Sequence, residues 1–272
     1  MRVFTDMAIP DPHPHEAPSA QTLRRGLGIL KLLARHQPGG LRISDIGRRL
    51  GLSKATAVRL TQTLVDEHFV VHDPLTRCYR LGPETFAVGL AAEPDYALQR
   101  VASSSLRALA LETGDWIFFS VAQGFEVICL SRETGDRPIP PDALQLGDRH
   151  PLGVGAGGLA ILASLPDAEV ELALRVNGPV IDAQFPNSPV SVIRSLVEPT
   201  RERGYAIIPG IVVPGYWALG VPLLQADGRP VAAIVVVASE TRLHPTRRAA
   251  LGERMLAMSR DIMEKAAQRL PG

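Results

Sequence analysis

The chain has 272 residues, with 29 Lys or Arg against 28 Asp or Glu, so its net charge at pH 7 is +1. This length suffices for two domains, each with its own hydrophobic core. The charge is unevenly distributed, because residues 1–82 carry 12 Lys or Arg against 7 Asp or Glu, whereas the remainder carries 17 against 21. The basic N-terminal part therefore suggests contact with a polyanion, and the acidic remainder suggests a separate role.

The two cysteines, Cys78 and Cys129, fall in different predicted domains, which argues against a disulfide framework. No Cys, His or carboxylate cluster has the spacing of metal ligands, so we expect neither a metal nor a cofactor. No apolar run approaches the roughly 20 residues of a membrane span, and the N-terminus is not built like a secretion signal. The sequence therefore predicts a cytoplasmic protein without membrane contact.

Residues 1–19 are rich in proline and predict a flexible leader. A first helix is expected to follow, with an inward-facing stripe of Leu23, Leu27, Leu30 and Ala34. On this prediction Arg24 and Arg25 face outward, and both are expected to contact DNA. The break at residues 38–40 then separates this helix from the next segment.

The segment 41–64 predicts two short helices joined by a tight turn. Ile43, Ile46 and Leu50 share one face of the first, Gly51 can close it in a left-handed conformation, and Ser53 can cap the second. The core-facing side of the second helix comprises Ala57, Leu60, Thr61 and Leu64. Its first turn and its outward side present Lys54, Ala55, Thr56, Val58, Arg59 and Gln62. Such a surface suits the major groove of DNA.

An ordinary two-helix corner with a solvated polar face explains segment 41–64 equally well. The following segment, 69–82, favours DNA binding, because two short β-prone runs flank an Asp73-Pro74 turn and predict a wing. In this wing, Arg77, Tyr79 and Arg80 are expected to contact DNA. Ser53, at the start of the second helix, is expected to contact DNA as well. The winged helix-turn-helix domain is thus predicted to span residues 20–82.

Amphipathic linker helices are predicted over residues 83–113. Beyond them, residues 114–272 predict an α+β domain: strands at 116–123 and 126–133, a Pro-rich loop to residue 150, and helices from 156, over 168–176 and over 190–203. We further expect strands at 205–213, 216–224 and 231–239, followed by a helix at 246–270. Strands separated by short turns indicate a mainly antiparallel sheet flanked by helices.

The string from Gly153 to Gly158 fits a GxGxxG pattern, but a polar, kinked segment precedes it where a dinucleotide site needs an apolar strand. A glycine-rich helix entry whose free amides face a pocket is the better interpretation. For catalysis, the Ser103–Ser105 run lacks the glycine flanks of a nucleophile elbow, and no nucleophile, base and orienting group can be assigned. The sequence therefore predicts that the protein is not an enzyme.

The strings LRRGLGILKLLARH, ISDIGRRLGLSKATAVRLTQTLVDEHFVVHD and RCYRLG resemble the DNA-binding domain of the isocitrate lyase regulator (IclR) family of bacterial transcription factors. The later elements are similar to the GAF-like effector domain of that family, so the resemblance covers almost all of the chain after the leader. It implies a homodimer or tetramer whose linker helix pairs with its mate. Val58 stands where family members often carry a polar residue, and it is suited to contact a thymine methyl group.

The resemblance also implies an effector pocket in the C-terminal domain. The residues expected to line it are Phe118, Leu130, Leu146, Gly155, Ala156, Gly157, Gly158, Trp217, Leu219, Val235 and Val237. Family members often carry Lys in the place of Gly158 and hydroxyl residues in the late strand, where this chain has valines. A small apolar or aromatic organic effector is therefore expected rather than a dicarboxylate.

The sequence thus predicts a regulator that binds a double-stranded DNA operator with an affinity controlled by this effector. The alternative is a ligand-binding protein or an enzyme whose N-terminal unit only packs or dimerises. The concentration of Arg and Lys on segments 41–64 and 77–80 favours the first hypothesis.

Overall fold

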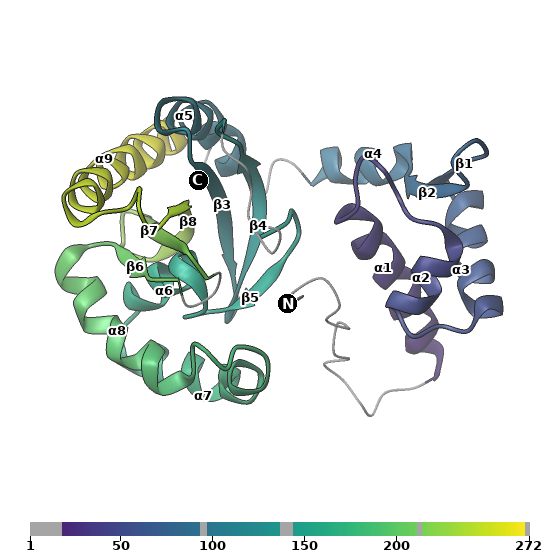
Figure 1. Ribbon diagram of the computed structural model, residues 1–272, viewed down its shortest axis with the longest axis horizontal. Coiled ribbons are helices and arrows are strands. Elements are labelled where there is room, and N and C mark those ends of the chain that lie inside the picture. The colour runs from purple at the N-terminus through teal and green to yellow at the C-terminus, as the bar shows by residue number, and fades with distance from the viewer. Residues whose placement is uncertain (1–17, 93–96, 137–143, 211–213, 270–272) are drawn as a thin grey trace. The chain divides into compact units, whose positions relative to one another are not determined.

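The computed structural model describes residues 18–92, 97–136, 144–210 and 214–269. The predicted leader, residues 1–19, therefore lies almost wholly outside the described residues. The chain divides into two compact units, Met1–Tyr96 and Ala97–Gly272 (Figure 1). The segment 83–113, expected as a linker, is shared between them, because its first helix belongs to unit one and its second helix to unit two.

Unit one is a winged helix-turn-helix. Its elements are α1 (Pro18–Ala34), α2 (Ile43–Arg49), α3 (Lys54–Asp66), β1 (Val70–Asp73), β2 (Cys78–Leu81) and α4 (Pro83–Ala91). The two strands pair antiparallel, with Val70 opposite Leu81 and Asp73 opposite Cys78. Leu41 adds a bridge to Tyr79 through two backbone hydrogen bonds, of 2.8 and 3.0 Å, so the wing is anchored to the segment that precedes α2. The predicted fold of this unit is confirmed.

The core of unit one is built around a different face of α1 from the one predicted. Ile29, Leu32 and Leu33 are buried against Ile46, Leu60 and Val70, whereas Leu23 and Leu27 are exposed. Both faces have helical spacing, so periodicity alone could not decide between them. The stripe predicted to begin at Leu23 and Leu27 is therefore wrong in its N-terminal half.

Unit two is an α+β domain around one sheet, as predicted. The strands of this sheet are β3 (Trp116–Gln123), β4 (Glu126–Glu133), β5 (Arg149–Pro151), β6 (Ala206–Ile208), β7 (Tyr216–Leu224) and β8 (Pro230–Ser239). Among the described residues their order is β5-β4-β3-β8-β7-β6, and all neighbours are antiparallel; the strands are labelled in Figure 1.

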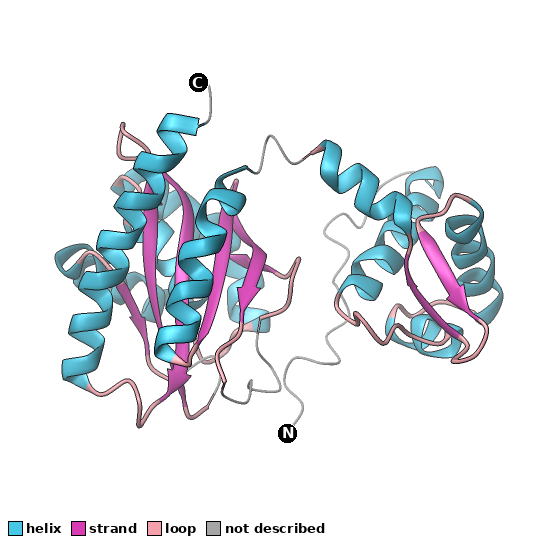
Figure 2. Ribbon diagram, turned by 90° about the horizontal axis from the view of Figure 1, so that it is seen from above, coloured by secondary structure: helices cyan, strands magenta, loops and turns pink. Residues whose placement is uncertain are grey.

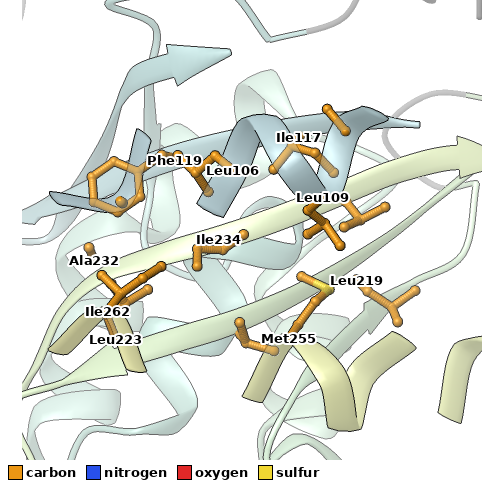
Figure 3. Packing of buried hydrophobic residues seen from close by; sticks show 14 of the residues in the cluster. Leu106, Leu109, Ile117, Phe119, Leu219, Leu223, Ala232, Ile234, Met255 and Ile262 are labelled. Atoms are coloured by element: carbon orange, nitrogen blue, oxygen red, sulfur yellow. The ribbon is translucent and has the colours of Figure 1, made fainter. Parts of the chain in front are cut away.

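Helices cover both faces of the sheet (Figures 1 and 2). One face packs against α5 (Ala97–Thr113) and α9 (Pro245–Arg269), and the other against α6 (Gly155–Ala163), with α7 (Asp167–Gln184) and α8 (Val190–Arg203) beyond it. The core under α5 and α9 is the larger cluster, in which Leu106, Leu109, Met255 and Ile262 meet alternate residues of β3, β7 and β8 (Figure 3).

The predicted elements differ from the structure where local signals are weak. Strand β5 is only three residues long and lies at the end of the predicted Pro-rich loop, yet it pairs with β4. Helix α7 continues past the predicted end at Val176 and includes Pro179. Strand β6 ends at Ile208, and residues 211–213 of the predicted strand lie outside the described residues.

A buried carboxylate joins the start of the sheet to the start of α9. Asp115 is 1% exposed, and its two oxygens form ion pairs with Arg242 at 3.0 Å and with Arg247 at 2.5 Å, of which the contact with Arg247 is also a hydrogen bond. Arg242 also donates to the carbonyl oxygen of Thr113, the last residue of α5. These contacts hold the α5–β3 turn against the segment that connects β8 to α9.

Candidate DNA interface and effector-binding region

The turn into α3 is fixed by backbone and side-chain hydrogen bonds. Gly51 adopts a left-handed φ of 61°, and the Leu52 N–H then reaches the Gly47 carbonyl at 2.8 Å, which closes α2. The Ser53 hydroxyl accepts a hydrogen bond from the Thr56 N–H at 3.2 Å and so caps α3. The predicted cap and turn are both present, and the N-terminal end of α3 is held in a defined direction.

The outward face of α3 presents the residues that the sequence nominated. Lys54, Ala55, Val58, Arg59 and Gln62 are all exposed, while Ala57, Leu60 and Thr61 are buried on the opposite side. In the part of the chain that the structure describes, no hydrogen bond or ion pair engages the Arg59 guanidinium. Gln62 donates to Asp66 at 2.8 Å, and Thr56 lies half-buried against the cap. Among the described residues, Arg59 and Lys54 are thus both available on this face, and Arg59 stands in the middle of it, where a base edge can be reached.

The wing turn is organised by Asp73. Its carboxylate accepts hydrogen bonds from the Thr76 hydroxyl and from the Leu75 N–H, each at 2.9 Å, and these contacts lower the pKa of Asp73. The stabilisation that these hydrogen bonds give to the folded wing is therefore present above the ordinary pKa of a carboxyl group. It is lost as the pH falls through the lowered pKa of Asp73. Arg77 follows this turn with a positive φ of 57° and an exposed side chain.

The other predicted DNA contacts have mixed surroundings. Arg25 is exposed on α1, Arg24 and Arg80 are half-buried, and Ser53 is exposed although it is engaged as the cap. Tyr79 packs against the core of unit one and lies 4.6 Å from the His72 ring, centroid to centroid. The structure therefore gives Tyr79 a role in holding the wing, while Arg77 is the more accessible of the wing residues.

The residues predicted to line the effector pocket lie on both faces of the sheet. Leu130, Trp217 and Leu219 pack into the core under α5 and α9, and Arg248 of α9 stacks over Trp217 at 4.2 Å. Phe118 and Val235 are paired on neighbouring strands and point toward α6, because side chains alternate along a strand. The eleven predicted residues therefore cannot line a single cavity, and the α6 side retains Phe118, Val235 and Val237.

The glycine-rich entry of α6 lies directly on the sheet. A Cβ at Gly157 would stand 2.9 Å from a methyl group of Val235, and one at Gly220 would stand 2.2 Å from the Ala156 carbonyl oxygen. At Gly158 a Cβ would approach backbone atoms of Gly153 and Pro151 at 3.2 Å. Gly157, Gly220 and Ala156 therefore serve close packing of α6 on β7 and β8, and Gly158 serves close packing of α6 on the segment 151–153. At the helix start, Gly155 is partly accessible.

Beside this packed region lies a group of side chains that sequence analysis only partly identified. Val237 is half-buried and is paired with Trp116 on one side and with Ala218 on the other. The Arg132 guanidinium carbon lies 5.5 Å from the centroid of the Trp116 ring, and Arg132 donates to the Gln145 side-chain oxygen at 2.7 Å. We call Trp116, Phe118, Arg132, Ala218 and Val237 the aromatic face.

Trp116 could have been found from the sequence, because it stands two residues before Phe118 and shares its side of the strand. Arg132 could not, since its position depends on the register of β4 against β3, which includes a bulge. Leu146 is exposed near Gln145, next to residues 137–143, which lie outside the described residues. Two cavities, of about 670 and 390 Å³, lie elsewhere in unit two, around Arg201.

Within the described ranges, no cluster of three His, Cys, Asp or Glu side chains is arranged to hold a metal ion. Burial raises the pKa of the Cys129 thiol to about 12, with a contribution from Asp148, so this cysteine is a poor nucleophile near neutral pH. Within the same ranges, no helix is long and apolar enough to cross a membrane.

Comparisons with known proteins agree with this architecture. Residues 22–74 match the profile of the IclR helix-turn-helix domain, and residues 94–264 match that of the bacterial transcriptional regulator IclR C-terminal domain. The HTH-type transcriptional repressor AllR of Klebsiella pneumoniae is 27% identical over 254 residues, which is 92% of this chain and 91% of the relative. The transcriptional regulator BhcR of Paracoccus denitrificans is also 27% identical, over 89% of this chain and 86% of its own.

Solved structures extend the likeness to three dimensions. An IclR transcriptional regulator from Alicyclobacillus acidocaldarius is 25% identical, with a TM-score of 0.70 over 92% of this chain and 99% of that one. An IclR homologue from Microbacterium hydrocarbonoxydans, solved as a complex with 4-hydroxybenzoate, has a TM-score of 0.70 at 20% identity, over 89% and 98% of the two chains. With both of its domains matched, this chain belongs to the IclR family, and it is a DNA-binding transcriptional regulator whose C-terminal domain binds a small-molecule effector.

Proposed function

We propose that the regulator reads its operator through Arg59, Val58 and Gln62 of α3 and positions itself on the phosphates through Arg77 of the wing. This proposal is supported mainly by the outward face of α3, which presents exposed hydrogen-bonding groups. The opposite side of the same helix is buried in the core of unit one. Base contacts from such a helix specify a sequence, whereas contacts to phosphates fix orientation. The experiment that tests this division of roles compares variants of the two arginines.

Arg77→Ala is expected to weaken binding to specific and unrelated DNA to a similar extent. Without this phosphate contact, DNA binding by the variant releases about one counterion fewer. The slope of log affinity against log salt concentration therefore becomes shallower by about one unit. Fluorescence anisotropy at four salt concentrations measures this slope. Leu75→Ala, at the exposed tip of the same turn, is the control for disturbance of the wing and keeps the parental slope. An unchanged slope for Arg77→Ala would remove this residue from the interface.

The protein is further proposed to act as a homo-oligomer paired through unit one. Leu23 and Leu27 on α1 are exposed at a spacing of four residues, as are Phe86 and Leu90 on α4. Exposed apolar rows of this kind are typical of surfaces that pair. A second copy covering them would present two α3 helices to two half-sites of an operator.

For the effector we propose a compact aromatic or apolar molecule with a single carboxylate, bound at the aromatic face. Trp116 and Phe118 are buried, at 8% and 2% exposed, and together with half-buried Ala218 and Val237 they form an apolar and aromatic wall, with the Arg132 guanidinium beside it. One cation on an apolar wall suits one carboxylate, and affinity then comes mainly from buried apolar area, at roughly 25 cal/mol per Å². The 4-hydroxybenzoate bound by the Microbacterium homologue is an acid of this class.

Val237→Trp is expected to abolish effector binding while leaving DNA binding without effector unchanged. The larger side chain would cover Trp116 and Ala218, which are paired with Val237 on the two neighbouring strands. Thermal shift measures the first property with 4-hydroxybenzoate and a series of substituted benzoates as probes, since a ligand raises the melting temperature by mass action.

Val231→Trp, at the other end of the same strand, is the matched control and keeps the parental response. Stabilisation of the parent by small dicarboxylates alone, or an undiminished response of Val237→Trp, would contradict the proposed effector class. Arg132→Met distinguishes the contribution of the guanidinium from that of the apolar wall. This variant should lose binding of the substituted benzoates but retain binding of their uncharged amides.

We also propose that the protein works in the cytoplasm and catalyses no reaction. The alternative of a ligand-binding protein or enzyme with a merely structural N-terminal unit is disfavoured by the charge distribution, because Lys54, Arg59 and Arg77 are exposed on the helix and wing that a DNA-binding domain would use. An assay of the parent protein against its own effector discriminates the two, since an enzyme would consume the ligand.

A further inference from the structure

Three hydroxyl side chains from three helices of unit two lie around one cavity of about 390 Å³. Thr200 continues the buried stripe of α8 that contains Ile193 and Val197, Ser259 is buried on α9, and Ser164 caps the C-terminal end of α6. Inward-facing positions of this kind normally carry apolar side chains, because a buried hydroxyl needs a hydrogen-bond partner. The hydroxyls therefore give this cavity a polar lining inside an otherwise apolar layer.

The cavity lies where the edge of the sheet is incomplete. Strand β6 pairs only with residues 218–220 of β7, so in the part of the chain that the structure describes, residues 221–224 have no strand beside them on that edge. Helices α6, α8 and α9 surround the cavity there. Its apolar walls are formed by Ala160, Ala163, Pro222, Leu224, Leu256 and Met263. These side chains are all aliphatic, which distinguishes the cavity from the aromatic face.

Two arginines of the lining have different roles. Arg201 donates to the carbonyl oxygens of Ala163 at 2.9 Å and Leu165 at 2.8 Å, and to Asp167 at 2.7 Å, so it fixes α8 to the end of α6. Arg260 is exposed at the rim of the cavity, and within the described ranges it makes no hydrogen bond or ion pair. Arg201 is therefore part of the wall, whereas Arg260 is available to an anion.

The hydroxyl groups define what the cavity can bind. Ser164 and Ser259 donate to backbone carbonyl oxygens of their own helices, at 2.9 and 3.0 Å, so their oxygens remain only as acceptors. Thr200 is 3% exposed, and among the described residues its Oγ1 atom has no hydrogen-bond partner. In contrast, Thr63 and Thr113 each donate to the carbonyl oxygen four residues earlier. An unpaired buried hydroxyl costs free energy, and a ligand hydroxyl would remove that cost.

We propose that this cavity is a second small-molecule site of the regulator and that it binds an aliphatic hydroxy acid. The aliphatic walls take the carbon chain, and the ligand hydroxyl accepts from Thr200 and donates to a serine oxygen. The carboxylate lies at the rim beside Arg260. The volume falls within the usual range for small-molecule sites, and the lining shares no residue with the aromatic face. The site is thus additional to the proposed effector site and does not rest on it.

The test is isothermal titration calorimetry of the full-length protein with 6-hydroxyhexanoate and 8-hydroxyoctanoate, compared with hexanoate and octanoate. The parent should bind a hydroxy acid more tightly than the matched acid. Thr200→Val should weaken the hydroxy acid by about 2- to 10-fold and leave the matched acid unchanged, because one hydrogen bond is lost. The variant should fold, since it replaces an unpaired buried hydroxyl with a methyl group. Thr61→Val makes the same change at a buried, unpartnered hydroxyl of unit one and should bind as the parent does.

Two further variants locate the ligand. Arg260→Met should weaken binding of the hydroxy acids by about 2- to 5-fold, as expected for an exposed charge pair, and should retain binding of the matched diols. Val237→Trp, at the aromatic face, should bind the aliphatic hydroxy acids as the parent does. Loss of their binding in Val237→Trp, or equal weakening of hydroxy and matched acids by Thr200→Val, would overturn the proposal. A parent that binds none of these probes would show that the cavity holds only water, and would overturn it too.

Discussion

Asp115→Ala is expected to lower the free energy of unfolding of unit two by about 3 kcal/mol, at the lower end of the range for breaking a buried ion pair. The carboxylate is almost fully buried and serves both Arg242 and Arg247, so its removal leaves two guanidinium groups without their main acceptor. The side chains of these arginines are 31% and 24% exposed, and this remaining hydration is why we expect the lower end. For a unit of this size the melting temperature should fall by about 6 to 12 °C.

The control for Asp115→Ala is Asp261→Ala. Asp261 also forms an ion pair, with Lys265 at 2.6 Å, but both side chains are about half exposed and lie one turn apart on α9. Exposed pairs of this kind contribute roughly 0.3 to 0.5 kcal/mol. Thermal unfolding followed by circular dichroism measures both variants. Equal effects of the two changes would show that the Asp115 contacts do not hold the turn to α9.

Arg59→Ala is expected to lower affinity for the specific operator by about 1 to 3 kcal/mol, or roughly 5- to 150-fold, with little effect on unrelated DNA. The reason is the loss of a base contact from the middle of the exposed face of α3. The variant should fold normally, because no interaction within the described residues depends on this guanidinium.

Arg203→Ala is the matched control for the loss of one positive charge, since Arg203 is an exposed arginine on α8 of unit two. Titrations of each protein against the operator and against unrelated DNA of equal length give the specificity ratio. If Arg59→Ala lowers binding to both DNAs equally, Arg59 contacts phosphates and another residue of α3 reads the sequence.

The sequence predicted most of the fold because its local signals agree with one another. Helix α8 has the predicted bounds, 190–203, between Pro189 and a left-handed Gly204. Strand β7 has the predicted bounds, 216–224, because a Pro-Gly turn precedes it and an Asp-Gly turn follows it. Strand β5 was missed because three residues carry no periodicity and its pairing is set by contact with β4.

The site was less predictable than the fold, since a site depends on which face each residue occupies. The apolar run of β7 has hydrophobic side chains on both sides, so the sequence could not tell that Trp217 and Leu219 face α9 while Ala218 faces away from it. The glycines of α6 predict a pocket entry, whereas in the structure Gly157 allows close packing on β8 and Gly158 allows close packing on the segment 151–153. The DNA-binding face was easier, because polar and apolar residues of α3 are cleanly segregated around one short helix.

The most direct test of the account is footprinting of the full-length protein on the intergenic DNA upstream of its own gene, with and without the ligand that thermal shift identifies. We expect protection of two half-sites by the parent, a change in protection when the ligand is added, and an unchanged footprint for Val237→Trp at the same ligand concentration. A parent that protects its operator equally with and without a ligand that raises its melting temperature would contradict the claim that the effector at the aromatic face controls DNA binding.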